Sequence, residues 1–162
     1  MTTSSHDAMR LLFVCTGNTC RSPLAAVIAR RALAARGLGQ VTVASAGTGA
    51  WADAPASDGA LLVALEHGLD LNPHRAQPLS AGLVAESDLV LTMGGSHLER
   101  VESLGGGGRA WLLGDYATGR PRMVSDPFGG DLAVYRETFD ELEELIGAAL
   151  DRLQREHLPA SA

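Results

Sequence analysis

The sequence predicts a single α/β domain, a four-stranded parallel sheet with helices on both faces. Two observations lead to this prediction. Short apolar runs typical of buried strands alternate along the chain with longer stretches of helical periodicity, and this alternation is typical of parallel sheets with right-handed crossovers. The chain has 162 residues, which suits one domain with its own core.

Four apolar runs are predicted to be the strands of this sheet. They are Leu11–Val14, Val41–Ala44, Asp88–Met93 and Ala110–Leu113. Ligands of such sheets bind beyond the carboxyl ends of the strands. The loops that follow these runs are therefore the expected places for functional residues.

Helices are predicted between and after the strands. The first runs from about Pro23 to Arg36, with Ser22 as its N-cap, Pro23 at the first helical position and Gly37 after its last turn. The loop from Gly114 to Gly130 is polar and rich in Pro and Gly, so it is predicted to be irregular. The remaining helices are predicted at Ala60–His67, from near Ser80, at Ser96–Leu104 and from about Leu132 to Leu153. The last of these spaces Leu132, Tyr135, Phe139, Leu142, Ile146 and Leu150 on one buried face.

The composition of the chain disfavours several classes of partner and site. The net charge of −6 argues against nucleic acid, and no apolar run reaches the length of a membrane span. The two cysteines lie five positions apart, which favours a reducing cytoplasm over a disulfide-stabilised exterior. The five histidines are scattered, so neither a metal site nor a cofactor is expected. Residues 1–9 and 158–162 are expected to be flexible tails around a domain of residues 10–157.

The segment Cys15-Thr16-Gly17-Asn18-Thr19-Cys20-Arg21-Ser22-Pro23 joins the first predicted strand to the first helix. Free backbone N–H groups and the positive end of the helix dipole meet there, which predicts an anion site. The spacing of Cys15 and Arg21 lets the loop wrap a tetrahedral oxyanion, with the sulfur at its floor and the guanidinium on two oxygens. The same N–H groups favour a nucleophilic thiolate. The alternative is that Cys15 is a buried structural cysteine.

The backbone of the loop carries the rest of the expected anion site. Gly17 and Asn18 suit the unusual backbone that a tight anion nest needs. The phosphate-binding residues are predicted to be Thr16, Gly17, Asn18, Thr19, Cys20, Arg21 and Ser22.

A second segment, Asp126-Pro127-Phe128-Gly129-Gly130, is the candidate source of a general acid. Its loop leaves the fourth predicted strand at the same end of the sheet as the cysteine loop, so Asp126 can meet Cys15. Pro127 stiffens the backbone at Asp126, and Phe128 is a candidate wall of the pocket. The alternative is a plain turn before the final helix. Asp115 and Asp131 are rival carboxylates, although Asp131 at a helix start is more typical of an N-cap.

Four segments in this order resemble the low-molecular-weight protein tyrosine phosphatase family: Cys15–Pro23, Ser45–Thr48, Asp88–Met93 and Asp126–Gly130. The resemblance covers nearly the whole chain. It implies that Cys15 is the nucleophile, that Arg21 clamps the transition state, and that Asp126 acts first as general acid and then as general base.

The resemblance also implies residues that support the loop and the pocket. Asn18, Ser22, Ser45 and His74 would hold the loop, with the Ser22 hydroxyl bonded to the thiolate. For His74 the alternative is an ordinary surface residue. Trp51 falls where the family has a pocket wall, and the alternative for Trp51 is a place in the core.

Two positions are similar to the bacterial protein-arginine phosphatase branch of that family. Thr19 stands where tyrosine phosphatases usually carry a branched apolar residue, and Phe128 is followed by two glycines instead of a second aromatic residue. The run Leu113–Gly119 is also similar to that branch. The resemblance implies phospho-arginine in proteins as the substrate, because a threonine hydroxyl suits a polar phosphoguanidinium that Asp126 can also bind.

Three other functions remain as alternatives. A tyrosine phosphatase would use the same residues on a different leaving group. An arsenate reductase needs further cysteines, and none follows Cys20; a non-catalytic binder of phosphorylated residues needs no acid such as Asp126. The expected partners are phosphorylated proteins, with phosphate or another oxyanion in the loop. We expect a monomer, and a Cys15–Cys20 disulfide on mild oxidation.

Overall fold

The computed structural model describes residues 8–158. The predicted tails at 1–9 and 158–162 fall almost entirely outside this range. Met9, however, is buried in the first strand, and Leu158 follows the last helix directly and packs on the core. The folded part is therefore slightly longer at both ends than the predicted 10–157.

Four parallel strands form one sheet, as predicted. They are β1 (Met9–Cys15), β2 (Val41–Gly47), β3 (Leu89–Thr92) and β4 (Ala110–Leu112). Their order is β2-β1-β3-β4, so β2 and β3 both pair with β1 and lie on opposite sides of it. The loops that leave the neighbouring strands thus diverge at the carboxyl end of β1, which is where such sheets open a crevice. Cys15 is the last residue of β1 and pairs in register with Gly47.

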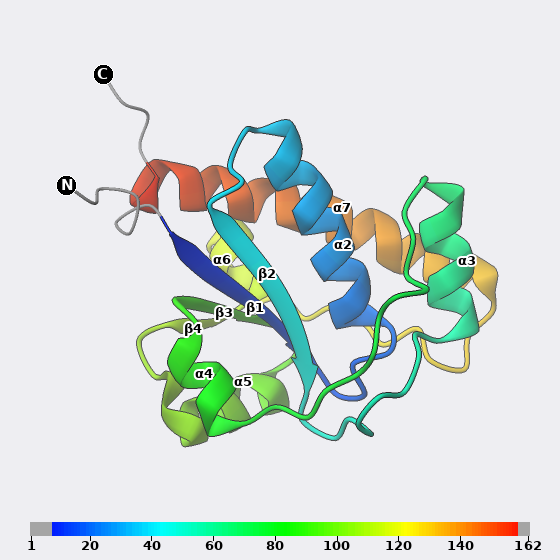
Figure 1. The fold of residues 1–162 in the computed structure, drawn as a ribbon, viewed down its shortest axis with the longest axis horizontal. Coiled ribbons are helices and arrows are strands. Elements are labelled where there is room, and N and C mark those ends of the chain that lie inside the picture. Colours follow the sequence, from blue (N-terminus) through cyan, green and yellow to red (C-terminus); the bar gives the residue numbers. More distant parts are fainter. Residues whose placement is uncertain (1–7, 159–162) are drawn as a thin grey trace.

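Helices cover both faces of the sheet (Figure 1). The buried residues form a larger and a smaller hydrophobic core on the two faces of the sheet. The helices that pack into the larger core are α2 (Arg21–Ala35), α3 (Asp58–Glu66), α6 (Leu113–Thr118) and α7 (Leu132–His157). Those that cover the other face are α4 (Ala81–Glu86), α5 (Gly95–Val101) and the irregular turn η1 (Glu102–Gly106). Alternate residues of β1 divide between the two: Leu11 and Phe13 enter the larger core, while Leu12 and Val14 enter the smaller one. Burial on both faces explains why β1 is a continuous apolar run.

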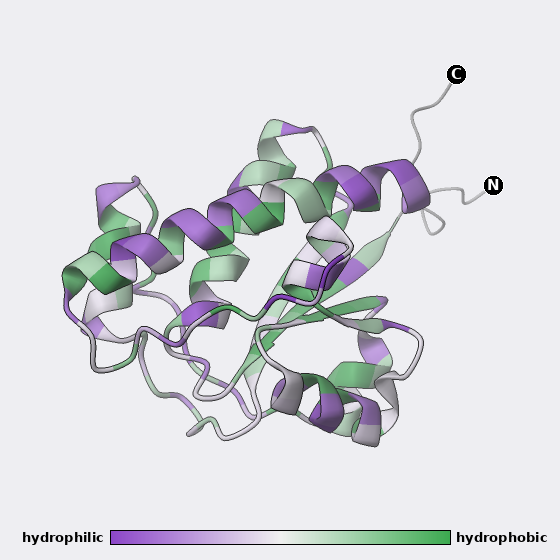
Figure 2. Cartoon of the chain, turned by 180° about the vertical axis from the view of Figure 1, so that it is seen from behind, coloured by the Kyte–Doolittle hydropathy of each residue, from purple (hydrophilic) through white to green (hydrophobic). Residues whose placement is uncertain are grey.

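The long helix α7 shows the predicted one-sided pattern, with hydrophilic and hydrophobic residues alternating along it in Figure 2. Tyr135, Phe139, Leu142, Ile146 and Leu150 are all buried. Asp131 caps this helix by accepting a hydrogen bond from the backbone N–H of Val134 at 3.1 Å, as its position predicted. Among the described residues, no helix is both long enough and apolar enough to cross a membrane.

Two of the predicted elements are wrong. The segment after β4 is not irregular at its start, because α6 follows the strand at once and ends at Thr118, where Gly119 caps it with a positive φ of 79°. Ser22 is not an N-cap, because α2 already begins at Arg21 and its N-cap residue is Cys20. The side chain of Ser22 is turned into the loop instead, and there it serves the candidate site described below.

Candidate active site

The loop between β1 and α2 presents its carbonyl oxygens outward. The carbonyls of Cys15 and Thr16 accept hydrogen bonds from the N–H groups of Thr48 and Gly49, both at 2.9 Å, and that of Thr19 accepts one from Ser57 at 2.9 Å. In the described part of the chain, no backbone N–H of residues 16–20 donates a hydrogen bond to another protein group. These N–H groups are therefore free to bind an anion.

Asn18 holds the loop in this shape. Its backbone has a positive φ of 57°, which asparagine tolerates better than most residues. Its side-chain amide is fully used, donating to Ser22 Oγ at 2.7 Å and to Ser45 Oγ at 2.9 Å, and accepting from the N–H of Gln77 at 2.9 Å. His74 adds a fourth contact from Nε2 to the Asn18 carbonyl at 2.6 Å. All four residues predicted to support the loop thus meet at one point.

The protonation of His74 follows from its surroundings. Burial is the largest effect and lowers the pKa of His74 below its ordinary value, and the nearby Arg30 and Arg75 act in the same direction. The hydrogen bond to Asn18 acts in the opposite direction. A neutral His74 with its proton on Nε2 donates to the Asn18 carbonyl. This half-buried position is not that of an ordinary surface residue.

The Cys15 sulfur lies 2.9 Å from Ser22 Oγ, and both residues are buried. Ser22 Oγ accepts a hydrogen bond from the Asn18 amide, and its own hydrogen is available to donate to the sulfur. A hydroxyl that donates to sulfur stabilises the thiolate more than the thiol. The contact with Ser22 is thus suited to a nucleophilic Cys15 rather than to a structural one.

Arg21 and Asp126 meet beside the loop. The guanidinium of Arg21, with a side chain only 8% exposed, donates from Nη1 to the Val124 carbonyl at 3.0 Å, and its Nη2 lies 3.6 Å from Asp126 Oδ2. Arg21 Nε is buried and has no protein partner among the described residues. Asp126 is half exposed, and its Oδ1 accepts from the N–H of Phe128 at 3.1 Å. The loop after α6 therefore reaches the cysteine loop, as the sequence predicted, and Asp126 is more than part of a plain turn.

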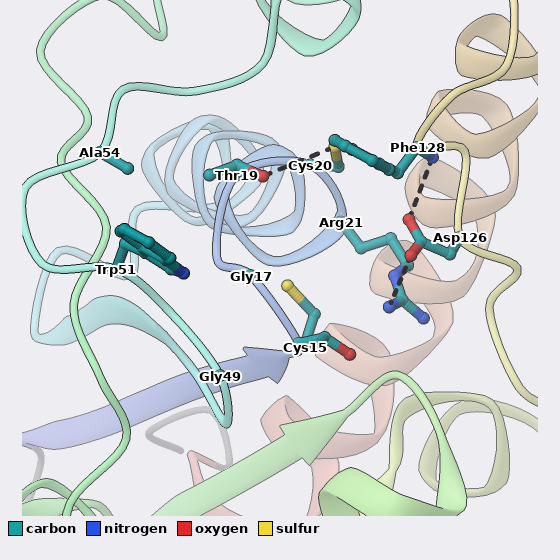
Figure 3. A pocket seen from close by; sticks show the side chains of 11 residues that line it. Cys15, Gly17, Thr19, Cys20, Arg21, Gly49, Trp51, Ala54, Asp126 and Phe128 are labelled. Atoms are coloured by element: carbon teal, nitrogen blue, oxygen red, sulfur yellow. Dashed lines mark hydrogen bonds and ion pairs between the residues drawn. The ribbon is translucent and has the colours of Figure 1, made fainter.

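A pocket of about 320 Å³ opens over the Cys15 sulfur. Figure 3 shows Trp51 on one side of this sulfur and Arg21 with Asp126 on the other. Trp51 and Phe128 are 84% and 74% exposed. Both line the pocket, so the alternative of a core Trp51 is wrong. Thr19 lines it as well, whereas the rival carboxylate Asp115 lies in α6 and is not among the lining residues.

Three neighbours of the loop were not predicted from the sequence. Cys20 Sγ lies 3.1 Å from Ser57 Oγ and 3.5 Å from the Tyr135 hydroxyl, and His97 Nε2 lies 2.8 Å from Thr16 Oγ1. Each of these contacts joins segments at least 37 positions apart, so no local sequence pattern could have indicated them. Among the described residues, no group of three His, Cys, Asp or Glu side chains could hold a metal ion.

Comparison with known proteins agrees with this geometry. The profile of the low molecular weight phosphotyrosine protein phosphatase family matches residues 10–158. A protein-arginine-phosphatase from Bacillus subtilis is 39% identical over 150 residues, which cover 91% of this chain and 99% of that protein. The low molecular weight protein-tyrosine-phosphatase PtpB from Staphylococcus haemolyticus is 41% identical over 140 residues, covering 86% of this chain and 96% of that protein.

A solved structure with the same fold is also informative. It is a Cys-to-Ser mutant of the YwlE arginine phosphatase with a phosphorylated active-site serine. The two chains are 36% identical and superpose with a TM-score of 0.85, over 91% of this chain and 97% of that one.

Proposed function

The chain belongs to the low molecular weight phosphotyrosine protein phosphatase family, and we propose that it dephosphorylates proteins through a phosphocysteine intermediate, with phospho-arginine as its substrate. The observation that carries the proposal is the loop around Cys15. It combines a sulfur 2.9 Å from the Ser22 hydroxyl with backbone N–H groups that no other protein group in the described range uses. A phosphorylated serine at the active site of the YwlE mutant supports a covalent phosphoenzyme here.

In the first step, the Cys15 thiolate attacks phosphorus. A sulfur–phosphorus bond forms while the bond from phosphorus to the leaving group breaks. The loop N–H groups and Arg21 stabilise the charge on the phosphoryl oxygens, and Arg21 Nε has no competing protein partner in the described structure. Asp126 gives its proton to the departing nitrogen of phospho-arginine, or to the oxygen of a phenol.

In the second step, the now ionised Asp126 takes a proton from water, and the water oxygen attacks phosphorus. The phosphorus–oxygen bond forms, the sulfur–phosphorus bond breaks and phosphate leaves. The thiolate is regenerated next to Ser22. Splitting one hydrolysis into two displacements lets the same loop stabilise both transition states. No step requires a cofactor.

Thr19 is the basis for proposing an arginine substrate. It lines the pocket, and its hydroxyl has a single protein contact among the described residues, the weak one to Cys20 Sγ at 3.8 Å. The hydroxyl is thus free to bind the N–H groups of a phosphoguanidinium, and Asp126, the proposed general acid, lines the same pocket. Tyrosine phosphatase activity is the second candidate, because the exposed rings of Trp51 and Phe128 could hold a phenol between them and PtpB is a similar relative.

Substitution of Thr19 separates the two substrates. We expect Thr19→Ile to leave guanidinium N–H groups without a partner and to give a phenol new apolar contact. The ratio of kcat/KM for phospho-arginine to that for phospho-tyrosine peptides should fall at least about tenfold, or about 1.4 kcal/mol. Thr42→Ile, an exposed position on β2, is the matched control. Wild-type preference for phospho-tyrosine, or a ratio unchanged in Thr19→Ile, would favour the tyrosine phosphatase.

The Cys15→Ser variant tests the covalent step independently of substrate class. It should lose turnover but keep its affinity for phosphate, because the loop N–H groups remain. Substantial turnover by this variant would contradict the mechanism.

We further propose that the protein works as a monomer in the cytoplasm, where a catalytic thiol stays reduced. Phosphate or another oxyanion is proposed to occupy the loop.

A further inference from the structure

His97 is a buried imidazole that the mechanism above does not use. It lies in α5, on the opposite side of the sheet from α2, and is only 3% exposed. Its Nε2 lies 2.8 Å from the hydroxyl of Thr16, the residue that directly follows Cys15. Thr16 is exposed and lines the same pocket as Cys15 and Asp126. A buried imidazole is thus joined to the hydroxyl of an exposed residue that lines the pocket.

The direction of this hydrogen bond follows from the other ring nitrogen. Nδ1 of His97 is buried and has no protein partner among the described residues, and Gly94 packs next to it. A proton on Nδ1 would be a buried donor without an acceptor, whereas a proton on Nε2 donates to Thr16 Oγ1. Burial and Arg21 lower the pKa of His97 from 6.5 to about 4, while Asp126 acts in the opposite direction, so the ring carries one proton at neutral pH. The favoured form therefore has this proton on Nε2.

An Nε2–H that donates to Thr16 leaves the hydroxyl hydrogen of Thr16 free to donate elsewhere. Thr16 directly follows the nucleophile, and it lines both this pocket and the neighbouring pocket that His97 and Arg21 also line. We propose that Thr16 donates a hydrogen bond from its hydroxyl to the phosphoryl group in the pocket, and that His97 is the positioning residue that orients this hydroxyl. The inference rests on the proposed phosphatase function, and it adds a side-chain donor to the backbone donors of the loop.

Four variants and one double variant test the pair with p-nitrophenyl phosphate, which needs no assumption about the natural substrate. Thr16→Val removes the hydroxyl at constant volume, and His97→Phe removes the donor that orients it. Each should lower kcat by about 10- to 100-fold with little change in KM, the loss expected for one hydrogen bond to a charged group. Thr16→Ser and His97→Gln keep a hydroxyl and an N–H donor, and should retain most of the activity.

The double variant Thr16→Val, His97→Phe should be no slower than the slower single variant, because the two residues act as one unit. His67→Phe is the control for loss of an imidazole elsewhere, since His67 stacks on Phe139 at 3.8 Å and does not line the pocket. Full kcat in Thr16→Val, or losses that multiply in the double variant, would overturn the inference. If His97→Phe does not fold, the comparison of Thr16→Val with Thr16→Ser decides alone. A wild type without turnover would instead refute the proposed phosphatase function.

Discussion

Acidification should destabilise this protein through His97, and the size of the effect follows from its burial. The pKa of His97 falls from 6.5 to about 4 on folding, mainly because burial disfavours the charged ring. At about 1.4 kcal/mol for each pH unit, this difference corresponds to about 3 kcal/mol of unfolding free energy.

The sign of the effect is set by which state binds the proton first. As the pH falls below 6.5, the unfolded chain protonates at this position while folded His97 stays neutral. The unfolding free energy contributed by His97 is therefore complete above pH 6.5, declines between pH 6.5 and 4, and changes no further below that range. At about pH 5 the loss should be about 2 kcal/mol.

Urea unfolding of wild type and His97→Gln, followed by tryptophan fluorescence between about pH 7.5 and 5, measures this contribution. The burial of His74 also lowers its pKa, but that contribution is common to both proteins and cancels in the difference. Wild type should lose about 2 kcal/mol more than His97→Gln at the acid end. If the unfolding free energies of wild type and His97→Gln fell in parallel with pH, a lowering of the pKa of His97 on folding would be disproved.

Three further predictions concern the reaction itself. Asp126→Ala should slow hydrolysis of substrates with poor leaving groups by about 10²- to 10⁴-fold, and p-nitrophenyl phosphate much less; equal losses on both would mean that Asp126 is structural. Arg21→Lys should be close to inactive in the same assay, because an ammonium makes no bidentate contact with the phosphoryl oxygens; near-normal kcat would exclude the clamp. Peroxide should inactivate wild type reversibly through a Cys15–Cys20 disulfide, detected by mass spectrometry, whereas Cys20→Ser should not recover with dithiothreitol. Equal recovery of both proteins would show that Cys20 only fills space.

The parts of the site that were predicted from the sequence are those encoded locally. The strand that ends at Cys15, the loop and the helix that follows are contiguous, so their order alone placed the sulfur at the carboxyl end of a strand. Asp126 was placed by topology, because parallel strands bring their following loops to the same edge of the sheet. The short helix α6 was missed, since six residues with a glycine carry little helical periodicity.

Ser22 shows why local patterns can mislead at such a site. A serine before a proline at a helix start is the usual signal of an N-cap, but here α2 begins at Arg21, two residues before Pro23, and Ser22 Oγ lies between the Asn18 amide and the Cys15 sulfur. A capping hydroxyl and a thiolate-stabilising hydroxyl have the same sequence signature, because both are small hydroxyl side chains at a helix start. The capping hydroxyl accepts from a free backbone N–H, whereas the other donates to the sulfur. What distinguishes Ser22 is a contact that no local pattern shows, since the Asn18 amide donates to its Oγ at 2.7 Å while the sulfur of Cys15 lies 2.9 Å from the same atom.

His97 is the opposite case, a residue with no local signature at all. Its partner Thr16 is 81 positions away, and its own helix belongs to the smaller core on the far face of the sheet. Only the pairing of β1 with β3 brings the residue after Cys15 next to the loop after β3. The loop around Cys15 is therefore supported from both faces of the sheet, by His74 through a carbonyl and by His97 through a hydroxyl. Burial lowers the pKa of both imidazoles, so both can serve as neutral hydrogen-bond donors at the pH where a thiolate is needed.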